Sequence, residues 1–289
     1  MKKLLILAMF VLSPFLLNAQ EYGKVYDNLK VPSKILKGER NFSIYLPPGY
    51  DASERSYPVL YLLHGYSDNH TGWIQFGEVN YIADKAINEG KATPMIIVMP
   101  DADTDRIGYF NTIDGDWNYE DYFFNELMPF VENKYRIRKE KRYRAIAGLS
   151  MGGGGTFVYA LHHSELFSSA CPLSAWFGEA NPEERVGEVD EYYKGKSKSE
   201  IKEHYDKNNP LVLVDNLPDK IAPENQIKWY IDCGDDDFLF EGNSLIHIKM
   251  RKKNIEHEYR VRDGGHSWSY WRSALLDVLK FVTDTFHQK

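Results

Sequence analysis

The chain has 289 residues, of which 43% are hydrophobic and 27% charged, and its formal net charge is −7 at pH 7. A chain of this length and composition suits one large globular domain. Because the negative charge is mild and spread along the sequence, it offers no basic surface to a phosphate backbone, and we expect no nucleic-acid partner.

The N-terminal residues have the pattern of a secretory signal peptide over 1–19. Lys2 and Lys3 precede the apolar run Leu4–Leu17, and a small residue, Ala19, ends the segment. The run is shorter than the roughly 18 residues of a spanning helix, which disfavours a signal anchor. A lipid anchor would need cysteine at the position of Gln20. We therefore expect cleavage after Ala19, a secreted or periplasmic protein, and no stable membrane insertion.

The rest of the chain begins with predicted strands. Val31–Leu36 and Phe42–Leu46 flank a polar turn and predict an antiparallel hairpin. The continuous apolar run Val59–Leu63 is typical of a strand buried on both faces of a parallel sheet. Four further strands are predicted over Met95–Met99, Tyr143–Ala147, Leu166–Pro172 and Lys228–Cys233.

Helical segments separate these strands. An apolar face repeats from Tyr119 to Tyr135 and again from Trp271 to Phe286. Strands that alternate with helices predict an α/β fold, with a mostly parallel central sheet and helices on both faces, in a single domain over 20–289. The charged segment 177–225 breaks the alternation and contains only a weak helix near Ser199–Tyr205. We expect an insertion or partial cap there.

The strongest chemical pattern is Gly148-Leu149-Ser150-Met151-Gly152, which lies between a predicted strand and a predicted helix. A serine in such a turn, with glycines two residues away on each side, is typical of a nucleophile elbow. The glycines allow close passage of the backbone, so that the serine hydroxyl stands at the carboxyl edge of the sheet. We expect Ser150 to be a catalytic nucleophile; the alternative is a glycine-rich packing turn.

A serine nucleophile needs a base, and in this arrangement the acid and then the base follow the serine along the chain. Only His266 among the downstream histidines lies in a glycine-bounded loop before the final helix, so it is the predicted base. The acid should follow the preceding strand, where Asp235, Asp236 and Asp237 are consecutive. Spacing alone does not separate these three carboxylates.

Acyl transfer also needs N–H donors for the developing oxyanion. The Met151 amide, directly after the nucleophile, is one expected donor. The second is expected in the early loop His64-Gly65-Tyr66, where we choose the Tyr66 amide. His64 is an alternative base, although its place at a strand end favours a supporting role in that loop.

Several aromatic residues follow predicted strands and would border the site. Their rings are of the kind that stacks on sugars and phenolic acids. We expect Trp73, Trp117 and Trp176 to bind substrate, beside Tyr66; the alternative is that these rings belong to the core.

Metal sites are not expected. Asp101–Asp105 begins like a calcium loop, but Arg106 replaces its glycine and Thr112 stands where the bidentate acid belongs. We therefore expect neither a metal nor a cofactor. Cys171 and Cys233, the only cysteines, lie in buried-looking strands, where we expect them to stay unpaired.

Four motifs occur in one order: Leu62-Leu63-His64-Gly65, the run from Gly148 to Gly153, Cys233-Gly234 followed by Asp237-Phe238-Leu239, and the run from Gly264 to Trp268. Together they resemble the esterase D-like, or feruloyl and acetylxylan esterase, family of α/β-hydrolases. The resemblance covers nearly all of the chain after the leader. In that family the acid is the last carboxylate of the Cys-Gly-x-x-Asp motif, which matches Asp237.

The resemblance implies an α/β-hydrolase fold and a cofactor-free serine carboxylesterase that works through an acyl-enzyme. Its expected substrates are small esters or esterified oligosaccharides, in particular feruloyl or acetyl groups on plant cell-wall polysaccharide fragments. One alternative is another exported esterase, for example a siderophore or general acyl esterase. Another is an acyltransferase that uses the same triad. No protein partner is indicated.

Overall fold

A computed structural model describes residues 21–104, 106–178 and 193–287. The predicted leader therefore lies outside the described residues, as does the segment 179–192 of the expected insertion. Within the described ranges, no helix is both long and apolar enough to cross a bilayer.

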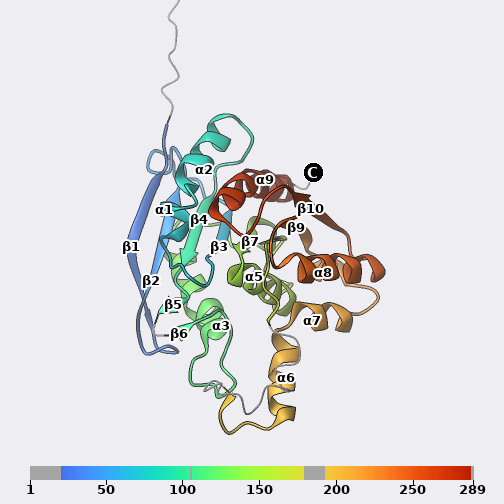
Figure 1. The fold of residues 1–289 in the computed structure, drawn as a ribbon. Coiled ribbons are helices and arrows are strands. Elements are labelled where there is room, and N and C mark those ends of the chain that lie inside the picture. Colours follow the sequence, from blue (N-terminus) through green and yellow to red (C-terminus); the bar gives the residue numbers. More distant parts are fainter. Residues whose placement is uncertain (1–20, 105, 179–192, 288–289) are drawn as a thin grey trace, which may run out of the picture.

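An eight-stranded sheet forms the centre of the fold, in the order β1-β2-β4-β3-β7-β8-β9-β10 (Figure 1). β1 pairs antiparallel with β2 and β2 with β4, whereas all later neighbours are parallel. The predicted hairpin and parallel sheet are thus confirmed. The strands are β1 (Lys24–Ser33), β2 (Gly38–Leu46), β3 (Val59–Leu63), β4 (Ile96–Pro100), β7 (Arg144–Leu149), β8 (Ser169–Leu173), β9 (Lys228–Gly234) and β10 (His257–Arg262), with a separate small pair, β5 (Asp103–Thr104) and β6 (Arg106–Ile107).

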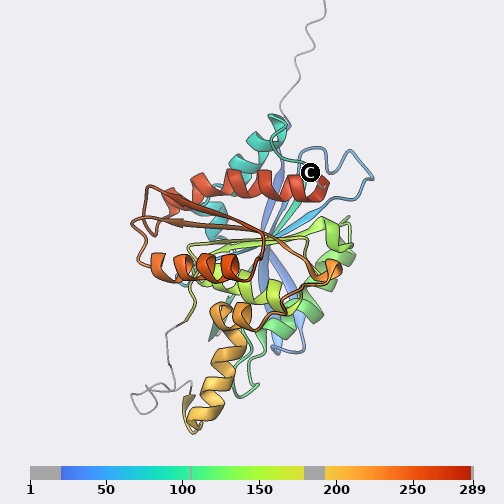
Figure 2. The same cartoon turned by 90° about the vertical axis from the view of Figure 1, so that its right-hand side faces the viewer.

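Helices cover both faces of the sheet, which gives the molecule two apolar cores. Figure 2 shows α9 on one side of the strands and α5 and α8 on the other. The helices are α1 (Gly72–Gln75), α2 (Val79–Asn88), α3 (Tyr119–Tyr122), η1 (Phe123–Leu127), α4 (Met128–Lys134), η2 (Lys141–Tyr143), α5 (Met151–His162), α6 (Lys198–Asn208), α7 (Pro210–Asn216), η5 (Pro223–Asn225), α8 (Phe240–Lys252) and α9 (Trp268–His287).

The helix predicted from Tyr119 to Tyr135 is present but not uniform. Its middle, η1, is a π-helical turn between α3 and α4. Pro129 explains the irregularity, because a proline ring inside a regular helix clashes with the carbonyl four residues earlier. A π turn just before the proline lets the chain continue in the same direction.

In its described part, the charged segment expected as an insertion contains two well-formed helices, α6 and α7, rather than one weak one. At α6 the Ser197 hydroxyl and the Glu200 side chain form a capping box. At α7 the Asn209 side chain accepts from the first amides, and Pro210 occupies the first turn. α7 packs on α5 and α8, whereas α6 projects from the lower end of the molecule in Figure 1.

Candidate active site

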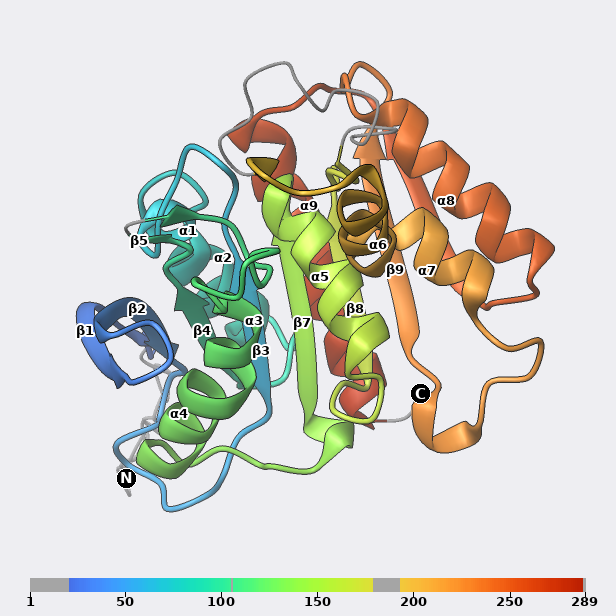
Figure 3. The same cartoon turned by 90° about the horizontal axis from the view of Figure 1, so that it is seen from below.

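Ser150 occupies a strained turn between β7 and α5. Its backbone angles are φ 54° and ψ −118°, which a non-glycine residue rarely adopts. The Ser150 amide donates to the Leu173 carbonyl at 2.9 Å, and the Trp176 amide donates to the Ser150 carbonyl at 3.0 Å. These bonds to the last residue of β8 and to the chain after it hold the turn in place. Helix α5, which starts at Met151, lies next to β7 (Figure 3).

Glycines on both sides of Ser150 are required by close backbone packing. A Cβ at Gly148 would lie 2.4 Å from the Gly152 carbonyl oxygen, and a Cβ at Gly152 would lie 2.6 Å from the His64 carbonyl oxygen. Real Cβ atoms do not approach that closely. Only glycine therefore fits at these two positions of the elbow, as the sequence pattern predicts.

His266 and Asp237 complete a hydrogen-bonded chain that ends at Ser150. The imidazole Nε2 lies 2.9 Å from the Ser150 hydroxyl oxygen, and Nδ1 lies 3.0 and 2.9 Å from the two Asp237 carboxylate oxygens. Because a carboxylate only accepts, Nδ1 donates to it and Nε2 accepts from the serine. The structure thus brings together all three residues that the sequence predicted as a triad.

Asp237 is buried and ionised. Burial alone would raise the pKa of its carboxyl, but hydrogen bonds from His266, the Leu239 amide and Ser174 outweigh it and lower the pKa. The carboxylate therefore keeps its charge where it faces His266. Asp235 and Asp236 are exposed, whereas both carboxylate oxygens within hydrogen-bond distance of His266 Nδ1 belong to Asp237.

The loops that carry the acid and the base pack backbone against backbone. A Cβ at Gly234 would lie 1.9 Å from the Gly264 carbonyl oxygen, so only glycine fits where β9 ends. The Asp236 amide donates to the same carbonyl at 3.2 Å, and the Gly264 amide donates to the Asp235 carboxylate at 3.0 Å. This packing fixes the distance between the two loops.

The predicted oxyanion loop lies beside the nucleophile. A Cβ at Gly65 would lie 3.5 Å from the Ser150 Cβ, so this loop passes close to the nucleophile. Tyr66 is the next residue along the chain. Met151 is the first residue of α5. Neither the Tyr66 nor the Met151 amide donates to another of the described residues, so both are available to a ligand oxygen.

His64 supports this loop from below and does not face Ser150. Its Nδ1 donates to the Gly65 carbonyl and its Nε2 accepts from the Ala102 amide, both at 2.8 Å. Burial lowers the pKa of His64 despite opposing contributions from that carbonyl and from Asp101, which keeps the ring neutral. Tyr109 anchors the His64 backbone, whose amide donates to the tyrosine hydroxyl at 2.8 Å.

The three tryptophans expected to bind substrate differ in exposure: two are buried and one is exposed. Trp73 is 1% exposed and donates its indole N–H to the Leu63 carbonyl, and Trp117 is 9% exposed beneath Arg40. Both rings pack in the cores and offer no face to a substrate, which corrects the expectation for these two residues. Trp176, 42% exposed, remains on the surface next to Ser150.

Two residues at the site were missed by sequence reasoning. Phe238 is 72% exposed, and its ring centroid lies 4.5 Å from that of His266. Ser174, just after β8, is among the groups that lower the pKa of Asp237. Phe238 directly follows the predicted acid, so its position in the motif could have identified it. Ser174 lies in a segment with no such motif.

Metal-binding groups are sparse among the described residues. Asp101 accepts from His70 at 2.8 Å and from the Asp103 amide, so the loop that begins like a calcium site is occupied by protein donors. The carboxylates of Asp235, Asp236 and Asp263 lie within 4.8 Å of one another, but all three are exposed. Exposed acidic groups of this kind do not by themselves make a metal site.

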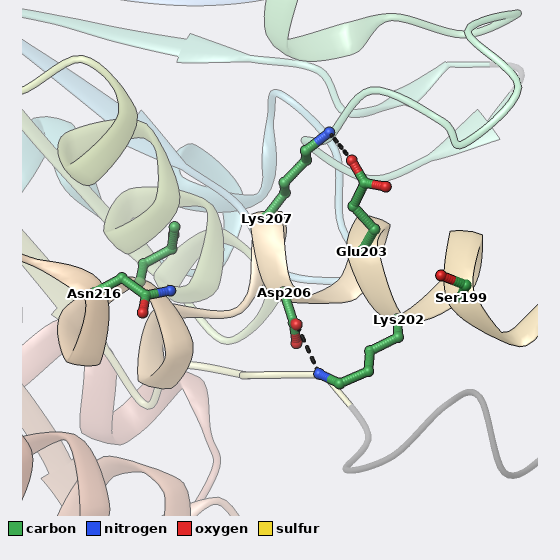
Figure 4. A pocket seen from close by; sticks show the side chains of 7 residues that line it. Ser199, Lys202, Glu203, Asp206, Lys207 and Asn216 are labelled. Carbon is green, nitrogen blue, oxygen red and sulfur yellow. Dashed lines mark hydrogen bonds and ion pairs between the residues drawn. The ribbon is translucent and has the colours of Figure 1, made fainter.

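A depression between α6 and α7 is separate from the triad. Its charged side chains pair within α6, Lys202 with Asp206 at 2.6 Å and Lys207 with Glu203 at 2.9 Å (Figure 4). It is lined by Ser199, Lys202, Glu203, Asp206, Lys207, Leu213 and Asn216. None of the triad residues lines it, and its charges neutralise one another.

Comparison with known proteins gives consistent matches. A structure described as a ferulic acid esterase is 34% identical, with a TM-score of 0.77, and the alignment covers 92% of this chain and 99% of that one. An endo-1,4-beta-xylanase/feruloyl esterase of Xylanibacter ruminicola is 36% identical over 49% of this chain. An acetyl esterase of Caldicellulosiruptor saccharolyticus is 22% identical over 81% of this chain and 86% of its own length.

The chain spans a small part of some relatives, namely 20% of the Xylanibacter protein and 27% of an esterase of Mycobacterium tuberculosis. S-formylglutathione hydrolases share the fold, for example one from Staphylococcus aureus with 23% identity and a TM-score of 0.69. The model of the Esterase family matches residues 33–282. The chain therefore belongs to the Esterase family and has the α/β-hydrolase fold.

Proposed function

We propose that this protein is an exported serine carboxylesterase that removes feruloyl or acetyl groups from fragments of plant cell-wall polysaccharide. One observation carries the proposal: the His266 imidazole is hydrogen-bonded to the Ser150 hydroxyl and to the Asp237 carboxylate at the same time. Such a chain turns an otherwise weak serine hydroxyl into a nucleophile.

In the first half-reaction the Ser150 oxygen attacks the ester carbonyl carbon while its proton passes to His266 Nε2. The carbonyl π electrons move onto the oxygen, which accepts hydrogen bonds from the Tyr66 and Met151 amides. When this intermediate collapses, the bond to the alcohol oxygen breaks and His266 returns its proton to the leaving alcohol. An acyl-enzyme on Ser150 remains.

In the second half-reaction water replaces the alcohol. His266 takes a proton from water, the hydroxide adds to the acyl carbon, and the bond to Ser150 breaks as the serine regains its proton. Asp237 holds the imidazole in the tautomer that both halves need and stabilises its charged form. The residues that act in these steps all belong to this chain, and we assign no step to a cofactor.

The substrate class rests on the relatives and on the exposed aromatic side chains around the triad. The two feruloyl esterase relatives favour an aromatic acyl group, and the acetyl esterase favours a small one. Phe238, Trp176 and Tyr66 are all exposed. Phe238 lies next to His266, the Trp176 backbone is bonded to that of Ser150, and Tyr66 belongs to the expected oxyanion loop. A planar phenolic acid or a sugar ring can stack on such side chains.

Export and domain organisation are part of the same proposal. The basic, apolar and small residues of 1–19 support a cleaved leader and a secreted or periplasmic enzyme. We assign 20–289 to a single catalytic domain, with 177–225 as an insertion or partial cap. A polymeric cell-wall substrate would require an enzyme outside the cytoplasm.

A hydrolysis panel tests the proposed activity. The mature enzyme is assayed on 4-nitrophenyl acetate, methyl ferulate and acetylated xylan, with and without a chelator. We expect turnover of the aryl acetate and of at least one of the other two, unaffected by the chelator. Failure on both methyl ferulate and acetylated xylan contradicts the substrate class. Acyl transfer to an added alcohol in preference to water would assign the enzyme to the acyltransferase alternative.

Phe238 offers a sharper test of the acyl site. Phe238→Ala removes the ring next to His266, and we expect kcat/KM for methyl ferulate to fall by about tenfold, the order of one lost stacking contact, with little change for 4-nitrophenyl acetate. Phe240→Ala is the matched control, because Phe240 is similarly exposed two residues away. Equal losses on both substrates would place the acyl group elsewhere.

A further inference from the structure

Asp232, two residues before the end of β9, is a fully buried carboxylate that none of the catalytic steps uses. It accepts three hydrogen bonds. The Arg262 guanidinium and the Tyr230 hydroxyl each donate to it at 2.8 Å, and the Tyr270 hydroxyl donates to its other oxygen. Burial, with Asp232 as a further cause, raises the pKa of both phenols, so they stay protonated and act as donors. A buried charge is costly unless it is paired and hydrogen-bonded, and these three donors satisfy it.

Two of the three donors stand at the two ends of the loop that carries the base. Arg262 is the last residue of β10, and Tyr270 lies in the first turn of α9, so His266 is midway between them in the sequence. The Arg262 guanidinium also lies over the Tyr270 ring, with its Cζ 4.7 Å from the ring centroid, and it donates to the Ser273 hydroxyl of α9 at 3.0 Å. Both ends of the loop are therefore fastened to one carboxylate on β9.

The Tyr270 ring also packs against the glycines at which the loops of the acid and the base meet. A Cβ at Gly264 would lie 2.8 Å from one carbon of this ring, and a Cβ at Gly234 would lie 3.2 Å from another. The hydroxyl at the far end of the ring is held by Asp232. The position of the ring therefore limits where the backbone of Gly264, two residues before His266, can lie.

We propose that Asp232 is a positioning residue for the base. Its carboxylate holds both ends of the loop that carries His266, and this inference rests on the proposed function of the triad. Reacting groups must be held closely, because a displacement of about 1 Å can cost about 100-fold in rate. Since Asp232 is buried and acts through its two loop partners, it should influence bond breaking without binding substrate.

Tyr230 provides a matched comparison for Tyr270. Its hydroxyl donates to the same carboxylate, but Tyr230 belongs to β9 itself and not to the loop of His266. Both tyrosines are buried, so a change of either one to phenylalanine removes one hydroxyl and leaves the ring in place. Because each variant loses one buried hydrogen bond, both should lose similar stability, and only Tyr270→Phe should disturb the base.

The experiment measures kcat and KM of Tyr270→Phe, Arg262→Gln and Tyr230→Phe on 4-nitrophenyl acetate, well below the thermal midpoint of each variant. We expect Tyr270→Phe and Arg262→Gln to lose about tenfold in kcat with KM unchanged, the pattern of an interaction lost only in the transition state. Labelling of Ser150 by a fluorophosphonate should slow in the same two variants, since it needs the same base. Tyr230→Phe should keep the wild-type kcat and labelling rate.

Thermal unfolding shows which variants fold, and the partly exposed Arg262 gives a second variant if Tyr270→Phe does not. A wild-type kcat in the folded loop variants would overturn the inference. An equal loss of kcat in Tyr230→Phe would overturn it too, because the carboxylate would then act through the fold and not through the loop. If the wild type itself is not labelled at Ser150, the proposed function fails, and this failure is distinguishable because it needs no variant.

Discussion

Three consecutive aspartates follow β9, and their surroundings give them different roles. Asp237 is buried and hydrogen-bonded to His266, whereas Asp235 and Asp236 are exposed. The Asp235 carboxylate still accepts from the Gly264 amide and so helps to hold the loop of the base. Only a carboxylate at Asp237 can fix the tautomer of His266.

Asparagine substitutions separate these roles. Asp237→Asn keeps the size of the side chain but removes the charge and can reverse the hydrogen bond to Nδ1, so we expect kcat to fall by about 10⁴-fold, as when the acid of another serine hydrolase is replaced in this way. Asp235→Asn retains an oxygen for the Gly264 amide and should cost less than about tenfold. A larger loss at Asp235 or Asp236 than at Asp237 would move the acid.

Sequence patterns predicted the residues that lie in the turns and loops after the strands. Ser150 and His266 were predicted because glycines mark the tight turns that hold them. Spacing left three candidates for the acid, and only the resemblance to the esterase family selected Asp237. Ser174 was not found, because its partners come from loops distant in sequence. The burial of Trp73 and Trp117 was missed for a similar reason: a loop position does not reveal which neighbours cover a side chain.

Elements were predictable where one periodicity dominates. The strand Val59–Leu63 was predicted with its observed bounds, since a fully buried strand is a continuous apolar run. β1 runs from Lys24 to Ser33, whereas the sequence predicted Val31–Leu36, because the first half of the strand, at the sheet edge, is mostly exposed and polar. α7 was missed because Leu211–Val214 is apolar and partly β-branched, and the Asn209 cap outweighs that preference.

A histidine at the end of α5 holds the end of α6. His162 Nδ1 lies 2.8 Å from the Glu120 carboxylate, and Nε2 lies 2.8 Å from the Lys207 carbonyl. Both partners are acceptors, so the ring donates from both nitrogens and is protonated. Burial would lower the pKa of His162, but Glu120 outweighs it and raises the pKa. Burial would likewise raise the pKa of Glu120, but His162 and His163 lower it.

This contact should make the attachment of α6 depend on pH. The His162 contribution is complete below its ordinary value of 6.5 and is lost as pH rises through the raised pKa. The Glu120 contribution is complete above 4.5 and is lost as pH falls through the lowered pKa. Between pH 6 and 9 we expect the C-terminal turn of α6 to open about fivefold more, for a contact of about 1 kcal/mol.

Amide hydrogen exchange of α6, compared at each pH with the variant His162→Gln, measures this opening. The variant cannot titrate at that position, so the ratio of protection between the two proteins isolates His162 from the intrinsic pH dependence of exchange. A ratio that stays constant from pH 6 to 9 would show that the contact does not hold α6.

At the scale of the whole molecule, two apolar cores enclose the sheet, and both cysteines are buried. Cys171 and Cys233 are unpaired. Burial raises the pKa of both thiols, that of Cys233 to about 12 with additional contributions from Asp237 and Asp232. A thiol that is buried and protonated is a poor nucleophile.

We expect the native enzyme not to react with a thiol reagent such as 5,5′-dithiobis(2-nitrobenzoate). After unfolding in guanidinium without reductant, both cysteines should react, because unfolding exposes thiols that are unpaired and buried as small apolar side chains in the native protein. Absence of reaction in the unfolded protein, restored by a reductant, would reveal a disulfide formed after export and contradict the unpaired state.

The most direct test of the account is at Ser150. A fluorophosphonate probe should label the wild-type enzyme at Ser150 alone, as located by mass spectrometry of the labelled peptide. Ser150→Ala should fold, remain unlabelled, and lose at least about a thousandfold in kcat on 4-nitrophenyl acetate, because triad residues act as one unit. Labelling at another residue, or near-normal turnover by the folded variant, would contradict the assignment of Ser150 as the nucleophile.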